Sequence, residues 1–183
     1  MSDQVCGLLS PFLRKKRIAA AFPYLKGKIL DFGCGVGALA EQWPSDQYFG
    51  VDIDEDSIKV AKVKLPEHRF ETHLPQGMRF DTIVMLAVIE HIDNPPALLR
   101  ILKELLEPKG TIVITTPHPA FEWIHTIGAR LGLFSLEGSR EHKKLANYET
   151  MNRWAQESGF QVTTYRRFLF GANQLFILRV GES

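Results

Sequence analysis

The sequence predicts an α/β protein with a doubly wound, mostly parallel sheet of seven strands, the last of them antiparallel. Short apolar runs alternate along the chain with segments of helical periodicity, as they do in βαβ units. The run from Ile83 to Ile89 is apolar throughout, which is typical of a central strand buried on both faces. A glycine-rich turn, Asp31–Gly37, directly follows another apolar run, as in nucleotide-binding loops.

Apolar periodicity, proline and glycine set the element boundaries. The predicted strands are Lys28–Phe32, Gln47–Val51, a short one opened by Arg69 and Phe70, Thr82–Leu86, Thr111–Thr115, Phe160–Arg167 and Ala172–Val180; the predicted helices are Ala38–Trp43, Asp56–Leu65, one starting at Pro95-Pro96, and Tyr148–Glu157. Pro44 and Pro66 end the first two helices, and Gly110 turns the chain into the fifth strand. The short link around Gly171 makes the last two strands an antiparallel hairpin at the sheet edge.

Composition indicates a single domain of ordinary size without a membrane span. The 183 residues are 45% hydrophobic and 23% charged, and no apolar run approaches the roughly 20 residues that cross a bilayer. The 22 basic residues balance 21 acidic ones, which argues against a nucleic-acid partner. The basic run Arg14–Arg17 could meet phosphates or acidic lipid, but it is read as the solvated face of a helix.

The cysteines and the N-terminus favour a cytoplasmic protein. Cys6 and Cys34 lie far apart, so a disulfide framework is not expected, and the first residues do not resemble a signal peptide. Nothing in the sequence indicates the oligomeric state.

The charge of the glycine turn restricts its ligand. Glycines at 33, 35 and 37 let a ligand lie almost on the main chain. Asp31 would repel the diphosphate of NAD, whereas it would attract the ammonium and sulfonium of S-adenosylmethionine (SAM). Gly33, Gly35 and Ala38 also satisfy the loose dinucleotide pattern, so the carboxylate, and not the glycine spacing, separates the two ligands.

The turn resembles the first motif of class I SAM-dependent methyltransferases. Four further segments resemble the rest of that family's core in the expected order: Tyr48–Asp54, Phe80–Leu86, Leu105–Ile114 and Ser158–Val162. The resemblance covers roughly Lys28 to Val180, and within the family it is to the small-molecule type, such as quinone O-methyltransferases. It implies a Rossmann-like sheet and SAM as the cofactor.

The resemblance also implies a set of cofactor-binding residues: Asp31, Phe32, Gly33, Cys34, Gly35, Gly37, Asp52, Ile53, Thr72, Leu86 and Ala87. Asp52 would accept both ribose hydroxyls, and Ile53 would press on the adenine ring. The family's usual adenine ligand is missing after the third strand, where Thr72 or Glu71 could serve instead. Leu86 and Ala87 would lie near the methionine part through their main chain.

No catalytic residue or metal site is assigned. Glu90-His91 resembles part of the Glu-x-x-Glu-His motif of metal-binding relatives, but Ala87 replaces the first glutamate, and adding His142 leaves the ligand set incomplete. Glu90 and His91 would otherwise close the pocket. His118 could be a general base or part of an inert turn, and Cys34 is read as a small residue that fits the loop and not as a nucleophile.

The sequence therefore predicts a single domain over residues 1–183 that methylates oxygen or carbon of a small-molecule acceptor. About residues 1–27 would form an N-terminal helical cap, and 117–145 an acceptor lid. Three alternatives stay open: a SAM-binding interaction module without catalysis, an enzyme resembling RNA 2′-O-methyltransferases, and a nucleotide-dependent oxidoreductase.

Overall fold

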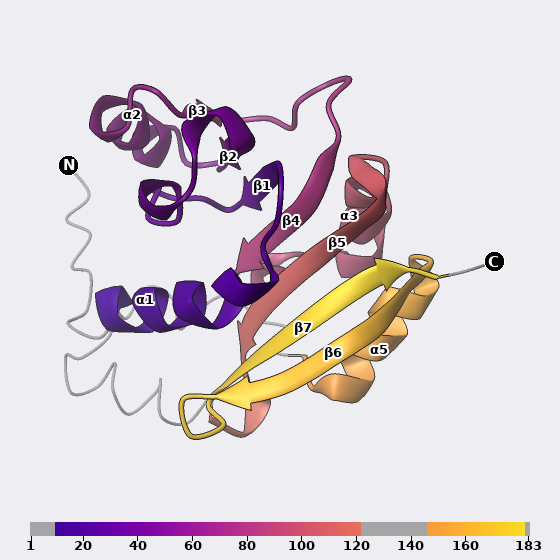
Figure 1. Cartoon of the computed structure of the whole chain (residues 1–183). Helices are drawn as coiled ribbons and strands as arrows, with labels where there is room; N and C mark the ends of the chain where they lie inside the picture. The colour runs from indigo at the N-terminus through magenta and orange to yellow at the C-terminus, as the bar shows by residue number, and fades with distance from the viewer. Residues whose placement is uncertain (1–9, 122–145, 182–183) are drawn as a thin grey trace.

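One sheet organises the structure, a computed structural model that describes residues 10–121 and 146–181 (Figure 1). The strand order is β3-β2-β1-β4-β5-β7-β6. The bounds are β1 Ile29–Phe32, β2 Tyr48–Val51, β3 Arg69–Glu71, β4 Phe80–Leu86, β5 Leu106–Pro117, β6 Phe160–Phe168 and β7 Asn173–Val180. The strands β1 to β5 are parallel, and β7 runs antiparallel to both β5 and β6. The predicted fold class is confirmed.

Four α-helices are described, together with short 3-10 turns. They are α1 Ser10–Ala21, α2 Glu55–Lys64, α3 Pro95–Lys103 and α5 Tyr148–Glu157; the turns are η1 Phe22–Tyr24, η2 Ala40–Gln42, η3 Ser45–Gln47, η4 Ile89–His91 and η5 Pro119–Phe121. The helices α3 and α5 cover one face of the sheet, with α1 and α2 on the other. The predicted helix Tyr148–Glu157 has exactly the observed bounds.

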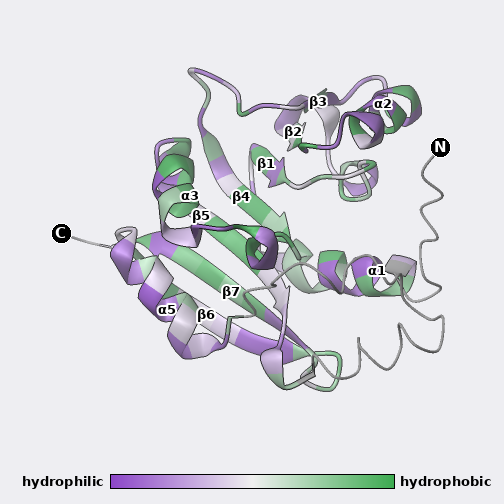
Figure 2. Ribbon diagram, turned by 180° about the vertical axis from the view of Figure 1, so that it is seen from behind, coloured by the Kyte–Doolittle hydropathy of each residue, from purple (hydrophilic) through white to green (hydrophobic). Residues whose placement is uncertain are grey.

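Alternation along the central strands builds a core on each face. In β1, Leu30 lies in the core under α3 and α5, while its neighbour Ile29 lies in the core under α1 and α2. In β4, Ile83 and Val84 divide in the same way. Both faces are covered, so the middle parts of the central strands are apolar, as the green stretches of β4, β5 and β7 show (Figure 2).

The helix predicted at Ala38–Trp43 is wrong. After the glycine loop the chain makes turns, and only Ala40–Gln42 forms a short 3-10 helix before Trp43 becomes extended. The physical reason is length: Gly37, with a φ of 81°, and Pro44 leave six residues between them, too few to repay the nucleation of an α-helix. No helix N-terminus therefore faces the loop in this part of the described chain.

The predicted start of the fifth strand needs correction, whereas the predicted hairpin does not. Strand β5 begins at Leu106, so Gly110 lies inside it and not at its start. The first part of β5 is irregular, and a Cβ at Gly110 would lie only 2.9 Å from the Glu107 carbonyl oxygen. This close approach of the backbone explains why residue 110 is glycine. The hairpin between β6 and β7 is confirmed; Leu169, Phe170 and Gly171 all have positive φ, with values of 52°, 54° and 88°.

The N-terminal segment is helical from Ser10 to Tyr24, where the structure describes it. The predicted lid at 117–145 lies outside the described residues from 122 onward. Among the described helices, none is long and apolar enough to cross a membrane.

Candidate active site

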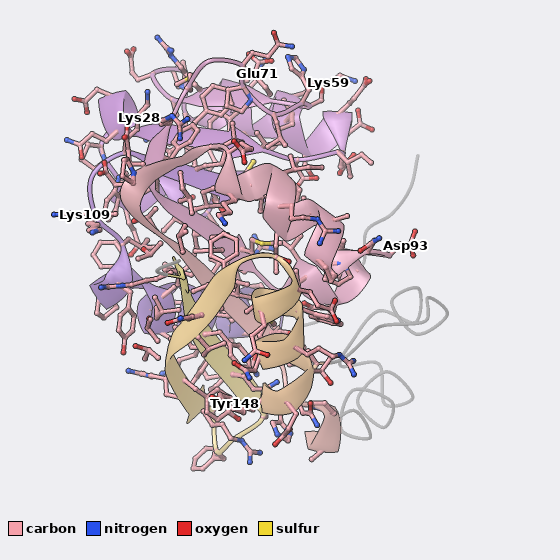
Figure 3. All side chains as sticks on the ribbon, turned by 90° about the vertical axis from the view of Figure 1, so that its right-hand side faces the viewer. Lys28, Lys59, Glu71, Asp93, Lys109 and Tyr148 are labelled. Carbon is pink, nitrogen blue, oxygen red and sulfur yellow. The ribbon has the colours of Figure 1, made fainter. Side chains whose placement is uncertain are left out.

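The glycine loop lies at the carboxyl end of β1, beside the carboxyl ends of β2 and β4. In open α/β sheets this edge is where ligands bind, next to the switch in strand order between β1 and β4. Figure 3 shows the two edges: Lys28 and Lys109 mark the side where β1 and β5 begin, and Asp93, in the loop after β4, lies on the opposite side. The amides of Gly33 and Cys34 both donate to the Val51 carbonyl oxygen, at 2.7 and 3.0 Å, which fastens the loop to β2.

The three loop glycines have different surroundings. Gly33, Gly35 and Gly37 have φ values of 81°, 51° and 81°, a region that side chains rarely adopt. A Cβ at Gly33 would lie 2.4 Å from Val88, and one at Gly37 would lie 3.0 Å from Phe70. A Cβ at Gly35 would meet no atom within 4 Å. The backbone at Gly35 therefore faces open space, while Gly33 and Gly37 are required by close contacts.

Asp52 ties this open backbone to the end of β2. Its Oδ2 accepts a hydrogen bond from the Gly35 amide at 2.7 Å, and its Oδ1 accepts one from the Asp54 amide at 3.0 Å. Each carboxylate oxygen can accept more than one hydrogen bond, so both retain acceptor capacity for a ligand hydroxyl. The next side chain, Ile53, is 93% exposed, and its apolar surface stands beside the same edge.

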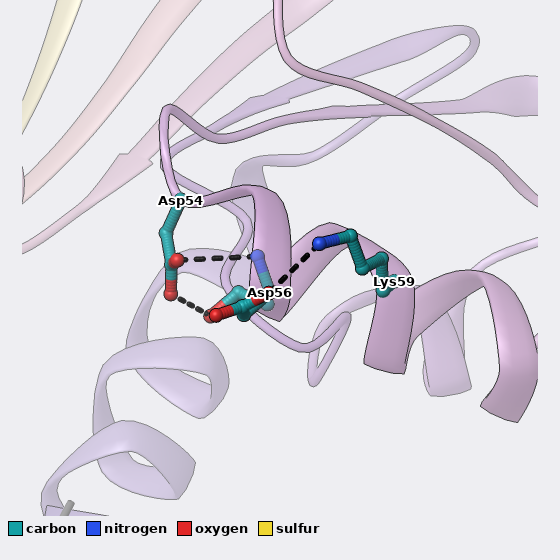
Figure 4. A network of polar contacts seen from close by, with 4 residues as sticks. Asp54, Asp56 and Lys59 are labelled. Atoms are coloured by element: carbon teal, nitrogen blue, oxygen red, sulfur yellow. Dashed lines mark hydrogen bonds and ion pairs between the residues drawn. The ribbon is translucent and has the colours of Figure 1, made fainter. Parts of the chain in front are cut away.

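The start of α2 fixes the direction of this segment. Asp54 is the N-cap: its side chain accepts from the Asp56 amide at 3.2 Å and from the Ser57 hydroxyl at 2.7 Å (Figure 4). The Ser57 hydrogen bond is the main cause that lowers the pKa of Asp54. Asp56 in turn pairs with Lys59 at 2.9 Å. Asp54 therefore ends the turn between β2 and α2, and this turn places Asp52 and Ile53 at the carboxyl edge of the sheet.

Asp31 lies behind the loop and not on its open face. The carboxyl is 2% exposed, and its Oδ2 accepts a hydrogen bond from the Tyr48 hydroxyl at 2.7 Å. Burial raises the pKa of Asp31 to about 7; the Tyr48 hydrogen bond lowers it and the nearby charge of Asp52 raises it. The predicted attraction of a cationic ligand would therefore act from beneath the backbone, and it stays a prediction.

Phe32 and Cys34 pack the loop from below. Phe32 is half-buried against the core under α3 and α5, and Cys34 is 8% exposed against the core on the other face. Burial raises the pKa of the Cys34 thiol, and the negative charges of Asp31 and Asp52 raise it further. The thiol is therefore held neutral, as expected of a residue that fits the loop and is not a nucleophile.

The residues at and after the end of β4 lie beside the glycine loop. Leu86 and Ala87 are half-buried, and the Ala87 amide donates to the Thr115 carbonyl oxygen at 2.8 Å. Ala87 has a φ of 61°, an unusual value for alanine, and this left-handed residue directs Val88 against Gly33. The structure thus brings the predicted Gly33 and Ala87 segments together.

The third strand offers two candidates for the adenine. Thr72 is exposed directly after β3. Glu71 lies at the same end of the molecule as Lys59 (Figure 3), and its carboxylate is 3.6 Å from the Lys62 amine. Because Glu71 already has a cationic partner, Thr72 is the freer of the two, and its role stays a prediction.

Buried Glu90 and half-buried Arg17 influence each other through their charges, which sequence reasoning missed. Glu90 is 3% exposed and accepts from the Thr116 hydroxyl at 3.1 Å; burial raises its pKa and the charge of Arg17 opposes this. Arg17 donates from Nε to the Asn173 side chain at 2.9 Å, and burial lowers its pKa. Reading Arg14–Arg17 as a solvated face is therefore wrong for Arg17, whose side chain is half-buried through its contact with Asn173, far along the chain.

The other candidate residues are only partly placed. Among the described residues, no three His, Cys, Asp or Glu side chains gather as a metal site would require, and His142 lies outside those residues. His118 accepts at Nδ1 from the Ala120 amide at 3.1 Å, and its pKa is lowered by burial and by the charge of Arg167. His118 is therefore neutral at pH 7, with Nδ1 hydrogen-bonded, and its role as a general base stays a prediction.

Comparison with known proteins agrees with this arrangement. Residues 8–165 match the methyltransferase domain family. The ubiquinone biosynthesis O-methyltransferase of Leptothrix cholodnii is 27% identical over 151 residues, which are 74% of this chain and 64% of the relative. That of Coxiella burnetii is 27% identical over 153 residues, 75% of this chain and 65% of the relative. The chain thus spans slightly less than two thirds of these relatives' length.

Solved structures show the same fold. The magnesium protoporphyrin IX methyltransferase of Synechocystis with bound S-adenosylhomocysteine (SAH) superimposes with a TM-score of 0.70 at 17% identity, over 99% of this chain and 90% of that one. A SAM-dependent methyltransferase of Clostridium acetobutylicum gives a TM-score of 0.68 at 12% identity, over 93% and 92%. With its sheet order, its glycine loop and the carboxylate of Asp52 directly after the second strand, the chain belongs to the class I SAM-dependent methyltransferases.

Proposed function

We propose that the protein transfers the methyl group of SAM to an oxygen or carbon atom of a small-molecule acceptor. The observation that carries this proposal is the pairing of Gly35 with Asp52. An exposed glycine backbone, over which a Cβ would meet nothing within 4 Å, is hydrogen-bonded to a carboxylate that can accept further hydroxyls. This is the surrounding that an adenosine carrying a cationic amino-acid tail requires.

We propose four contacts between the described residues and the cofactor. We assign Asp52 to the ribose hydroxyls, Ile53 to one face of the adenine, and the main chain of Leu86 and Ala87 to the methionine part. Thr72 is assigned to the adenine edge. When bound, SAM supplies a methyl group already activated by its sulfonium, so the protein's main task is to hold the acceptor in line with that group.

A polar floor supports a small acceptor beside the methionine part. Glu90 in η4 and Thr116 near the end of β5 are buried and hydrogen-bonded to each other, and the half-buried Arg17 on α1 acts on Glu90 through its charge. We propose that Glu90 and Arg17 receive a polar group of the acceptor at the base of its pocket. Helix α1, which brings Arg17, would cap this pocket from the N-terminal side, and residues 117–145 would close it from above.

The names of the relatives favour the same acceptor class. The matched ubiquinone enzymes are O-methyltransferases of a small molecule, and the Synechocystis enzyme methylates a porphyrin. The near-neutral charge, +1, is a weak argument against RNA as the acceptor. A cytoplasmic location is consistent with this proposal.

Calorimetric titration with SAM, SAH and NAD tests the cofactor assignment. We expect SAM and SAH to bind and NAD to fail, and Asp52→Ala to weaken SAH binding by about tenfold or more, since a charged hydrogen-bond acceptor is lost. Asp46→Ala is the matched control, because Asp46 is an exposed carboxylate that makes no contact with the loop. Preferential binding of NAD would overturn the proposal.

Transfer of a labelled methyl group from SAM tests catalysis. The acceptor panel would contain catechols, phenols, porphyrins and short RNA, each with the wild type and the Asp52→Ala variant. Label in a small molecule supports the proposal, and label in RNA alone contradicts the acceptor class. Tight SAH binding without transfer to any acceptor would instead favour a SAM-binding interaction module.

A further inference from the structure

The Asp31–Tyr48 hydrogen bond joins two adjacent parallel strands directly beneath the glycine loop. In the register of β1 and β2, Ile29 pairs with Tyr48 and Asp31 pairs with Gly50. Tyr48 therefore reaches forward along the sheet, past a glycine, to place its hydroxyl 2.7 Å from Asp31 Oδ2. Both residues are 2% exposed, so water does not compete for this hydrogen bond.

The ring of Tyr48 is fixed on its other sides. Its centroid lies 5.5 Å from that of His68 and 5.6 Å from that of Phe70, both in edge-on arrangements. His68 is itself tied through Nε2 to the Trp43 carbonyl oxygen at 3.0 Å. Within the part of the chain that the structure describes, the Tyr48 hydroxyl is thus directed at Asp31 Oδ2 and helps to orient that carboxyl.

The groups that face Asp31 carry no compensating positive charge. Asp31 is surrounded by Tyr48 on β2, Asp52 after β2 and Cys34 in the loop. The charge of Asp52 raises the pKa of Asp31, and an ionised Cys34 would raise it as well. Among the described residues, no Lys, Arg or His forms an ion pair with Asp31. A buried carboxyl in such surroundings favours its protonated form until a cation approaches.

We propose that Tyr48 is a positioning residue that prepares Asp31 to lose a proton when the ammonium-bearing half of the cofactor occupies the glycine loop. The inference rests on the proposed function and adds to it a proton-linked step in cofactor binding. The O–H bond of the Asp31 carboxylic acid breaks, the proton leaves to solvent, and the remaining negative charge is balanced by the positive charge of the ligand. The Tyr48 hydroxyl continues to donate to the carboxylate that results.

The geometry gives the linkage a definite direction. The pKa of Asp31 is about 7 in the unliganded protein. Binding of a cation that requires the carboxylate should therefore tighten as the pH rises toward neutrality, where the ligand ammonium stays protonated. From about pH 5.5 to about pH 7, the fraction of ionised Asp31 rises about 15-fold, and the affinity for SAH should follow it.

Calorimetric titration with two ligands separates this linkage from other effects of pH. SAH carries the ammonium, whereas 5′-methylthioadenosine has the same adenosine and sulfur but no amino-acid tail. We expect the SAH dissociation constant to fall about 15-fold over the stated pH range and that of methylthioadenosine to change less than about threefold. Repeating the SAH titration in buffers of different ionisation enthalpy should show release of a proton.

Tyr48→Phe tests the positioning role with the loss of one oxygen atom. Without the hydrogen bond the pKa of Asp31 rises, so SAH should bind more weakly at about pH 7 and recover at higher pH, while methylthioadenosine binding stays the same. Asp31→Asn should remove the pH dependence altogether. Tyr165→Phe is the matched control, since its hydroxyl is 3.3 Å from Gln174 on the far side of the sheet and does not contact the loop.

The outcomes are distinguishable. If wild-type protein binds neither SAH nor methylthioadenosine, the proposed function fails. If both bind and their affinities vary equally with pH, or if Tyr48→Phe leaves the pH profile of SAH unmoved, the inference fails and the proposed function stands. A Tyr48→Phe variant that melts earlier but keeps the wild-type profile would assign Tyr48 a purely structural role, against the proposal.

Discussion

Gly35 is the residue whose surroundings most directly indicate a ligand. Its φ of 51° favours glycine on conformational grounds, yet no neighbouring atom requires the absence of a side chain. Gly33 differs, because Val88 occupies the space that a Cβ there would need. Packing within the protein therefore does not account for the open space over Gly35, and we propose that the cofactor occupies it.

Gly35→Ala should weaken SAH binding without an unusual loss of stability. Gly77 is a matched control: it has a φ of 67°, and a Cβ there also meets nothing within 4 Å. Both alanine variants should lose about 1–2 kcal/mol from left-handed backbone strain. Only Gly35→Ala should raise the SAH dissociation constant, measured by calorimetry. Equal SAH affinity of the two variants would exclude Gly35 from the binding face.

The sequence could predict those site residues whose identity depends on the local backbone conformation. Gly33, Gly35 and Gly37 follow from the backbone of the turn, and Asp52 follows from its place at the end of a strand. Tyr48 and Arg17 could not be found in this way, because their importance comes from partners in other strands. A tyrosine at the start of an apolar strand is indistinguishable from an ordinary core residue until the strand register is known.

Among the elements, α2 determines how the second strand presents its carboxylate. The N-cap Asp54 satisfies amides at the start of the helix, and the Asp52 side chain accepts from the Asp54 amide. The cap and the proposed ribose ligand are thus consecutive parts of one reversal. Loss of the cap would loosen both.

Asp54→Ala should lower the thermal midpoint, and the difference from wild type should shrink in acid. The pKa of Asp54 is lowered, mainly by the Ser57 hydrogen bond, so its stabilising effect is present above its ordinary pKa and lost as the pH falls through the lowered value. Asp56→Ala is the control, because its exposed pair with Lys59 contributes little. Thermal unfolding at neutral and acid pH checks this; equal effects of both variants would contradict it.

The bounds of a helix or strand could be predicted from the sequence where a clear local pattern of apolar and capping residues determines them. Helix α5 was bounded correctly because its amphipathic pattern begins after the N-cap Asn147 and ends before Gly159. The expected helix after the glycine loop did not form, since proximity of Gly37 and Pro44 outweighs the helical propensity of the residues between them. Strand β5 is longer than predicted because pairing with β4 begins at Leu106 and pairing with β7, far along the chain, extends to Pro117.

At the scale of the molecule, buried carboxyls make the folded state sensitive to pH. Asp31 and Glu90 both have pKa values raised by burial, and neither forms a close ion pair among the described residues. A raised pKa means that the proton stabilises the fold fully below the ordinary value, and that this stability is lost as the pH rises through the raised value.

Asp31→Asn should stabilise the unliganded protein at alkaline pH. The pKa of Asp31 moves from 3.8 to about 7 on folding, so ionisation at pH 8 costs up to about 4 kcal/mol that the amide does not incur. Urea denaturation at about pH 5 and about pH 8 should give a larger advantage of the variant at pH 8. Glu90 is present in both proteins, so its effect on the free energy of unfolding cancels in the comparison. Parallel stability curves would contradict the prediction.

The position of β7 between β5 and β6 has a consequence for synthesis of the chain. The strand β7 follows both β5 and β6 in the chain, so until it is synthesised, β5 lacks its antiparallel partner. Helix α1 is synthesised before every described strand, yet Arg17 donates to Asn173, which lies on β7. The nascent chain therefore cannot complete its fold vectorially from the N-terminus, and its unpaired β5 edge is the surface that a ribosome-associated chaperone would have to shield.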